Sequence, residues 1–293
     1  MVHLHIERRG DGPQVLFVHG SVMGGAATWE AQYPLADRWT LLVLDRRGFG
    51  ESSPADREDF EVDARDIAEV LGDGAHLVAH SYGGVGSLLA AAAHPEAVRS
   101  LTLVEPVAYS VALHQTAVRS CVEQLTAYFA STPTGMREFL EGFYQVVGLQ
   151  AKLPDLLPPA LEATARLLMR SRSPWTADIP LDELARAPFR SLVISGGHSR
   201  VFESICDVLA ERIGAERAVI PGRGHAVPRT GTPFNERVES FLLAAERPSG
   251  MRLRHAGIGR LSPWTSRERP CAGRSAPRRQ AALGDREGSC AAA

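Results

Sequence analysis

A serine and a histidine, each placed in a sharp turn, are the side chains whose types and settings could carry chemistry. Ser81 lies in HLVAHSYGG, where an apolar run of strand type passes directly into an Ala- and Leu-rich helical segment. A serine at such a strand-to-helix turn is held out above a sheet, and its small neighbours Ala79 and Gly83 relieve the crowding. His225 lies in RAVIPGRGHAV, in a glycine turn after a short strand. A serine hydroxyl beside a histidine base is a nucleophile for acyl transfer.

These two turns must be positioned by the elements around them. From residue 14 onward, short apolar runs alternate with longer segments of helical period. We predict strands at 15–18, 40–44, 76–79, 100–104, 191–195 and 217–220, with a weaker one at 3–7. We predict helices at about 24–36, 60–71, 83–93, 201–213 and 233–246. The pattern predicts an α/β fold, with a mostly parallel, doubly wound sheet that helices cover on both faces.

The alternation stops between about residues 108 and 188. Amphipathic helical segments separated by Pro and Gly occupy this stretch, at 118–131, 134–148 and 158–171. No strand of comparable quality lies among them. We interpret the stretch as a helical cap inserted over the C-terminal edge of the sheet, where open α/β sheets bind ligands.

The segments group into three parts. We expect a core of residues 1–107 and 188–247, a helical cap of residues 108–187 and a tail of residues 248–293. The tail is rich in Arg, Ser, Gly, Pro and Ala and has no hydrophobic periodicity, so we predict that it is disordered. Its dispersed arginines could instead contact nucleic acid or another anionic surface, but few aromatic residues accompany them.

Several motifs resemble those of the α/β-hydrolase superfamily. The stretch AHSYGG around Ser81 resembles the G-x-S-x-G nucleophile elbow of that family, with Ala79 in place of the first glycine. LLVLDRRGFGESS is similar to the D-x-R-G-x-G-x-S turn of the family, in which we expect Asp45 and Arg47 to tie down the loop. The order of Ser81 before His225 also agrees. The resemblance covers roughly residues 10 to 246 and implies a serine hydrolase of α/β-hydrolase type with a helical cap. A serine that only caps a helix is the alternative, but it leaves the strand-turn-helix setting unexplained.

The resemblance also implies an oxyanion hole. VLFVHGSVMGGAATW follows the first strong strand, and in the family such a loop donates one backbone N–H while the residue after the nucleophile donates the other. The matching donors here are Ser21, or alternatively Val22, and Tyr82. We interpret His19 as a structural residue that braces the loop.

The acid of the triad is the open question. Most of the family keeps an Asp in the turn after the sixth strand, and that turn here reads GGHSRVF, without a carboxylate until Glu203 and Asp207 in the next helix. Some members carry the acid one strand earlier, where this chain has RSLTLVEPVAY. The carboxyl ends of parallel strands share one edge of a sheet, so Glu105 can accept the N–H of His225. We predict the triad Ser81, His225 and Glu105, with no acid at all as the alternative.

Two residues occupy the turn that lacks the acid. His198 and Ser199 could line the substrate pocket, bonding to a substrate carbonyl or to Glu105, or they could only shape the turn. Val22 is a further candidate for the pocket wall.

The predicted function is a cofactor-independent serine hydrolase that cleaves a small ester, thioester or lactone through an acyl-enzyme on Ser81. Ser in the elbow disfavours haloalkane dehalogenase and epoxide hydrolase chemistry, which need a carboxylate nucleophile. Two alternatives stay open. The same scaffold could carry hydroxynitrile lyase-like or cofactor-free oxygenase chemistry, or the protein could be a non-catalytic, hydrolase-like ligand-binding protein.

The composition limits the partners. A formal net charge of −2 gives no basic stripe for nucleic acid, so we expect a small-molecule substrate. The charged N-terminus does not read as a secretory signal, and no run of about 18 apolar residues is present, so we expect a cytoplasmic protein without a membrane partner. The four cysteines, without CxxC spacing, indicate free thiols, and we expect no metal. Oligomeric state is left open.

Overall fold

One sheet of seven strands organises the described residues, which are 2–131, 135–147 and 152–247 of the computed structural model. The strand order is β1-β3-β2-β4-β5-β6-β7. The strands are β1 (Ile6–Arg9), β2 (Gln14–Val18), β3 (Thr40–Leu44), β4 (Ala75–His80), β5 (Val98–Val104), β6 (Arg190–Ser195) and β7 (Glu216–Val219). β1 is antiparallel to β3 and every other pairing is parallel. The predicted mostly parallel sheet is confirmed.

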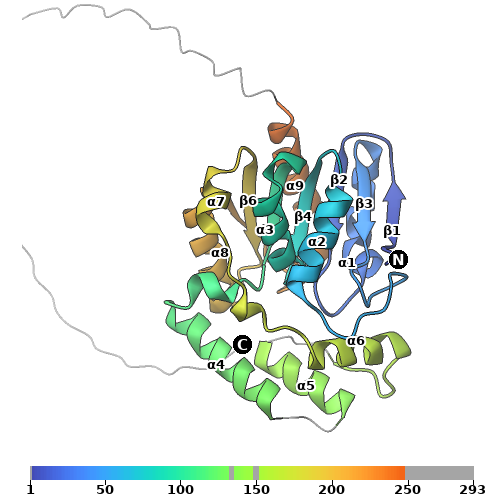
Figure 1. Cartoon of the computed structure of the whole chain (residues 1–293), viewed down its shortest axis with the longest axis vertical. Coiled ribbons are helices and arrows are strands. Elements are labelled where there is room, and N and C mark those ends of the chain that lie inside the picture. Colours follow the sequence, from blue (N-terminus) through green and yellow to red (C-terminus); the bar gives the residue numbers. More distant parts are fainter. Residues whose placement is uncertain (1, 132–134, 148–151, 248–293) are drawn as a thin grey trace, which may run out of the picture. The chain divides into compact units, whose positions relative to one another are not determined.

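Successive side chains of the strands pack alternately into two separate hydrophobic cores, one on each face of the sheet. Leu16 and Val18 of β2 belong to a cluster with residues of helices on one face, whereas Val15 and Phe17 belong to a cluster on the other face. The first face carries α2 (Phe60–Leu71), α3 (Tyr82–Ala93), α7 (Leu181–Arg186) and α8 (Arg200–Ile213). The second face carries α1 (Gly25–Trp29), η1 (Glu30–Asp37) and α9 (Thr232–Ala245). The sheet is therefore doubly wound, as expected (Figure 1).

The chain between β5 and β6 forms a helical cap. It contains α4 (Thr116–Ala130), α5 (Met136–Val147) and α6 (Pro159–Met169), which lie together at one end of the sheet in Figure 1. α4 packs against α5 and α8, and α5 packs against α6. The short 3₁₀ helices are η2 (Pro95–Ala97), η3 (Tyr109–Ala112), η4 (Pro174–Thr176) and η5 (Val227–Thr230). The limits of the cap at residues 108 and 187 stay a prediction, and the predicted tail, 248–293, lies outside the described residues.

One predicted helix differs from the structure. The segment 24–36 does not form a continuous α-helix, because α1 ends at Trp29 and the 3₁₀ helix η1 follows it. Pro34 lies inside η1, where it has no N–H to donate and its ring would clash with the carbonyl of Glu30 in an α-helix. The tighter helix avoids that clash.

Candidate active site

Two residues of the predicted triad have backbone conformations that side chains rarely adopt. Ser81 has φ 55° and Glu105 has φ 41°, and among the described residues these are the only non-glycine residues with positive φ. Each such conformation costs on the order of 1–3 kcal/mol and persists only where the surroundings hold it. Ser81 joins β4 directly to α3, and Glu105 directly follows β5. The strained positions are therefore the ends of two adjacent parallel strands.

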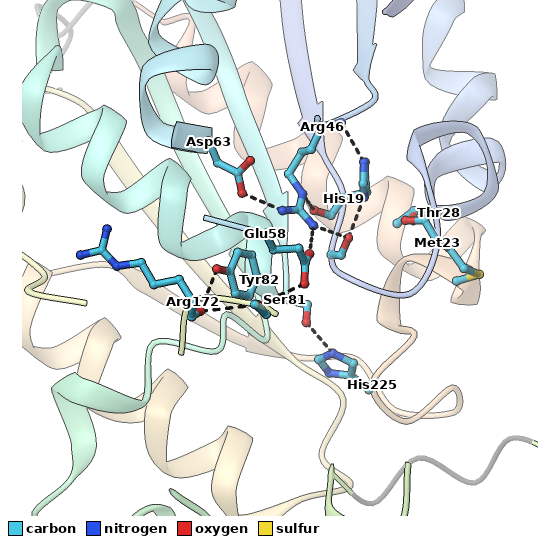
Figure 2. Close-up of polar contacts among 12 residues, drawn as sticks. His19, Met23, Thr28, Arg46, Glu58, Asp63, Ser81, Tyr82, Arg172 and His225 are labelled. Atoms are coloured by element: carbon cyan, nitrogen blue, oxygen red, sulfur yellow. Dashed lines mark hydrogen bonds and ion pairs between the residues drawn. The ribbon is translucent and has the colours of Figure 1, made fainter. Parts of the chain in front are cut away.

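Three side chains from distant segments meet at this edge of the sheet. Ser81 Oγ lies 2.9 Å from His225 Nε2, and Figure 2 shows this contact. His225 Nδ1 lies 2.7 Å from Glu105 Oε2. His225 reaches the site from the turn between β7 and η5. The structure thus places the serine, histidine and glutamate in the order Oγ, imidazole, carboxylate that general-base activation requires.

The carboxylate of Glu105 is completely buried but well supplied with donors. Its Oε1 accepts the N–H of Gly196 at 2.6 Å, and His198 Nδ1 lies 3.3 Å from the same oxygen. Burial alone would raise the pKa of Glu105, but the hydrogen bonds from His198, His225 and the Gly196 N–H outweigh burial and lower that pKa to about 2. Glu105 is therefore ionised at neutral pH and can accept the Nδ1–H of His225.

The turn after β6 contacts the same carboxylate through His198. The hydrogen bond with Glu105 raises the pKa of His198 against the lowering effect of burial. The cavity described below is lined by Val22, whereas neither His198 nor Ser199 is among the described residues on its wall. Of the roles that the sequence left open, the geometry agrees with a bond to Glu105 for His198, because the turn directs its imidazole at that carboxylate. Ser199 begins α8 as its N-cap, in agreement with a role in shaping the turn.

The two carboxylates that first follow β6, Glu203 and Asp207 in α8, are engaged elsewhere. Glu203 accepts from the Ser195 hydroxyl at 2.8 Å and from the Gly197 N–H at 3.0 Å. It also pairs with Arg217, which in turn pairs with Asp207 at 2.9 Å. Neither carboxylate occupies the position of a triad acid.

The predicted oxyanion donors flank the serine. A Cβ built on Gly20 would lie 2.8 Å from Ser81 Cβ, so only glycine lets this loop approach the elbow. The N–H of the next residue, Ser21, belongs to that loop, and Ser21 lines the cavity together with Tyr82. The N–H of Tyr82 is the first amide of α3, and the first amides of a helix have no partner within the helix. Both predicted donors thus lie beside Ser81.

A buried arginine behind this loop is a site feature that the sequence analysis missed. Arg46 is 2% exposed and pairs with Glu58 and Asp63, each at 2.6 Å. Its guanidinium also donates to the carbonyl oxygens of His19, at 3.0 Å, and Gly20, at 2.8 Å (Figure 2). The sequence offers two adjacent arginines after β3, and periodicity alone does not tell which one points inward.

Two further side chains hold the histidine and were also missed. His80 Nε2 lies 2.8 Å from the carbonyl oxygen of His225, and burial lowers the pKa of His80 to about 3, so His80 is a neutral donor there. The ring of Phe202 stacks on that of His225 with the centroids 4.4 Å apart. Their sequence signals are weak: His80 only precedes Ser81 in the chain, and Phe202 lies in the first turn of α8.

A cavity of about 330 Å³ opens beside Ser81. Its wall is mainly apolar and comes largely from the cap and its connections to the core, for example Tyr109, Leu125, Phe129, Phe143, Val147 and Trp175. Arg229 is the only arginine or lysine among the described lining residues; it is exposed and lies 3.4 Å from Glu30. The cavity therefore suits an uncharged, apolar group next to the serine.

Within the described residues, no group of three or more His, Cys, Asp or Glu side chains is arranged to hold a metal ion. The helices of those residues also include none that is both long and apolar enough to cross a membrane.

Comparison with known proteins identifies the family. The profile of the alpha/beta hydrolase family matches residues 15–278, and the chain therefore belongs to that family. An α/β hydrolase from Sphaerobacter thermophilus aligns with a TM-score of 0.61 and 23% identity, covering 81% of this chain and 95% of that one. An esterase from Thermogutta terrifontis aligns with a TM-score of 0.57 and 24% identity, covering 84% and 95%. At these identities the two structures establish the shared fold.

Curated relatives match over shorter segments. The 2-(acetamidomethylene)succinate hydrolase of Mesorhizobium japonicum is 33% identical over 109 residues, which are 36% of this chain and 39% of the relative. The pimeloyl-[acyl-carrier protein] methyl ester esterase of Aeromonas hydrophila is 35% identical over 102 residues, which are 34% of this chain and 40% of the relative. The chain thus spans about two fifths of the length of these relatives.

Proposed function

We propose that this protein is a cofactor-independent serine hydrolase that cleaves esters through an acyl-enzyme on Ser81. The acyl group of its substrate is small and carries no charge. The observation that carries the proposal is the continuous chain of contacts from Ser81 Oγ through His225 to the buried carboxylate of Glu105, at 2.9 and 2.7 Å. Membership of the α/β-hydrolase family and the esterase names of several relatives support it.

Each residue has a defined role in the proposed reaction. Glu105, ionised, accepts the Nδ1–H of His225, which leaves Nε2 as the base that takes the proton of Ser81 Oγ during attack on the ester carbonyl. The N–H groups of Ser21 and Tyr82 bind the oxygen of the tetrahedral intermediate. His225 then returns the proton to the departing alcohol, which leaves Ser81 acylated. A water molecule, deprotonated by His225, attacks the acyl-enzyme, and the proton passes back to Ser81 as the acid leaves.

The apolar wall of the cavity limits which acyl groups the proposed substrate can carry. An acyl group beside Ser81 faces the apolar wall formed by residues such as Phe129, Phe143 and Trp175. Removing a carboxylate from water without a partner costs several kcal/mol, whereas an apolar group gains free energy from the same burial. Thioesters and lactones of uncharged acids fit the same chemistry, because both carry an acyl carbonyl that Ser81 can attack.

Trapping the acyl-enzyme tests the proposal. The wild type is mixed with a p-nitrophenyl ester of a short, uncharged acid, quenched in acid and analysed by peptide mass spectrometry. We expect an acyl adduct on the peptide that contains Ser81, a burst of p-nitrophenol, and loss of both in Ser81→Ala. Turnover without an adduct in rapid-quench samples, or turnover retained by Ser81→Ala, would contradict the acyl-enzyme. No turnover on a panel of esters, thioesters and lactones would favour a ligand-binding protein.

A further inference from the structure

The loop of residues 19–24, between β2 and α1, carries the predicted oxyanion donor Ser21, and we call it the oxyanion loop. Among the described residues, the guanidinium of Arg46 is the only charged group that contacts carbonyl oxygens of this loop. Arg46 is the second residue after β3, and its backbone N–H donates to His19 Nε2 at 3.0 Å. His19 Nδ1 lies 2.7 Å from the carbonyl oxygen of Gly20. Burial, followed by the positive charge of Arg46, lowers the pKa of His19 to about 3, so the neutral ring donates from Nδ1 and accepts at Nε2. The Gly20 oxygen therefore receives two hydrogen bonds, one of them from a cation.

That carbonyl and one predicted oxyanion donor are parts of a single peptide group. The planar peptide that carries the Gly20 oxygen also carries the N–H of Ser21, and in a trans peptide the two point in opposite directions. Fixing the oxygen toward Arg46 therefore fixes the direction of the N–H. Donors on a carbonyl oxygen also polarise the peptide, and such cooperative bonds strengthen one another by roughly 10–30% each.

The position of the guanidinium is itself fixed by other groups. Asp63 pairs with Nη1 of the guanidinium, and Glu58 pairs with Nη2, the nitrogen that also donates to the Gly20 carbonyl; Figure 2 shows the three side chains in contact. The guanidinium carbon also lies 5.2 Å from the ring centre of Tyr82, the residue that supplies the second donor. A fully buried, doubly paired arginine has little freedom to move, so it can serve as a rigid support for the loop.

We propose that Arg46 is a positioning residue of the oxyanion hole, which orients and polarises the Ser21 N–H through the Gly20 carbonyl. This inference rests on the proposed hydrolase function. Arg46 does not touch the substrate, and it acts at the step in which negative charge develops on the carbonyl oxygen. Its removal should thus lower kcat and leave ground-state binding nearly unchanged.

The variant Arg46→Lys tests this role, with Arg47→Lys as its matched control. Lysine keeps the charge that balances Glu58 and Asp63 but lacks the planar fork that reaches both carboxylates and both carbonyls. Arg47 is the neighbouring arginine and pairs instead with Asp66, at 2.5 Å. We expect kcat of Arg46→Lys to fall about 10- to 10²-fold, less than the loss for removing a whole donor, with KM within about threefold. Arg47→Lys should stay near wild type.

Inhibitor binding separates a positioning role from a merely structural one. A trifluoromethyl ketone forms a hemiketal with the serine and places an oxyanion in the hole, whereas the matching methyl ketone binds without one. In Arg46→Lys the affinity for the trifluoromethyl ketone should fall by the same factor as kcat, and that for the methyl ketone should not. An equal loss for both inhibitors, or no loss for either, would overturn the inference.

An amide resonance gives a readout that does not depend on turnover. The ¹⁵N and ¹H shifts of the Ser21 amide should move in Arg46→Lys more than those of other loop amides, and they should not move in Arg47→Lys. If the wild type cleaves no ester, the proposed function fails and this measurement alone decides the inference. If Arg46→Lys does not fold, the charge-neutral variant Arg46→Met/Glu58→Gln/Asp63→Asn replaces it, and unchanged kcat and Ser21 shifts there would overturn the inference.

Discussion

Ser81 and Glu105 are clamped by the backbone of the strands beside them. The Ser81 N–H donates to the carbonyl of Val104 at 3.0 Å, and the Glu105 N–H donates to that of Ile194 at 2.9 Å. These bonds extend the ladder of parallel strands by one residue past the end of β4 and of β5. The strained dihedrals are thus held by the sheet, which fixes the directions of Oγ and of the carboxylate before any ligand binds.

At the scale of the single residue, His198 should make stability depend on pH. Its pKa is raised above the ordinary value of 6.5 by the contact with Glu105, so the folded protein binds this proton more tightly than the unfolded chain does. The stabilising contribution is complete below pH 6.5 and is lost as the pH rises through the raised pKa. His198→Asn should therefore lower Tm more at pH 6 than at pH 9. We expect calorimetric scans of both proteins across this range to show a difference that shrinks as the pH rises; a difference that is constant or grows would contradict it.

At the scale of the element, α3 packs closely on the chain that follows β5. A Cβ on Gly84 would lie 2.7 Å from Pro106 Cβ, and Pro106 follows Glu105 directly. Gly84→Ala should force α3 and this turn apart, which we expect to lower the free energy of unfolding by about 1–3 kcal/mol and to reduce kcat by moving Glu105. Urea titration measures the first effect.

Gly135→Ala is the control for this substitution. Apart from its neighbours in the chain, no atom of the described residues lies within 4 Å of a Cβ built on Gly135, so the added methyl group meets none of them. We expect its free energy of unfolding to stay within about 0.5 kcal/mol of wild type. Equal stability of Gly84→Ala and Gly135→Ala would show that the contact between α3 and Pro106 is less tight than the geometry implies.

Elements were more predictable from the sequence than side-chain directions. The buried strands could be found because strands covered on both faces are continuous apolar runs, and β4 leading straight into α3 located the elbow. The 3₁₀ helix around Pro34 was missed because helical period does not distinguish 3₁₀ from α-helix over a short stretch.

Side-chain directions in turns had no periodic signal. Arg46 and Arg47 follow β3 in adjacent positions, yet one points into the protein and the other pairs with Asp66. His198 could equally face the cavity or Glu105 as far as its sequence shows. The direction in which each of these side chains points depends on the partners that lie near it in the fold, and these partners come from distant parts of the chain.

At the scale of the whole molecule, the core holds the proposed triad of Ser81, His225 and Glu105, and the segment between β5 and β6 provides most of the apolar cavity wall. An ester whose acyl chain ends in a carboxylate should therefore be a poor substrate. Steady-state kinetics with p-nitrophenyl butyrate and p-nitrophenyl hemisuccinate compare chains of similar length, and we expect kcat/KM to be about 10²-fold or more lower for the charged ester. Arg229→Gln tests whether the exposed arginine binds the carboxylate of the charged ester. If the wild type cleaves both esters at comparable rates and Arg229→Gln cleaves the charged one much more slowly, the proposal of an uncharged substrate is contradicted.

The proposed hydrolase depends on Glu105, directly after β5, as the acid for His225. Measuring kcat/KM of Glu105→Gln beside Glu203→Gln tests it most directly, because Glu203 is the nearest carboxylate in the turn and helix where most of the family places its acid. We predict a loss of about 10³- to 10⁴-fold for Glu105→Gln, as for other triad acids replaced by amides, and a far smaller change for Glu203→Gln. Wild-type turnover by Glu105→Gln, or an equally large loss in Glu203→Gln, would contradict the role of Glu105 as the triad acid.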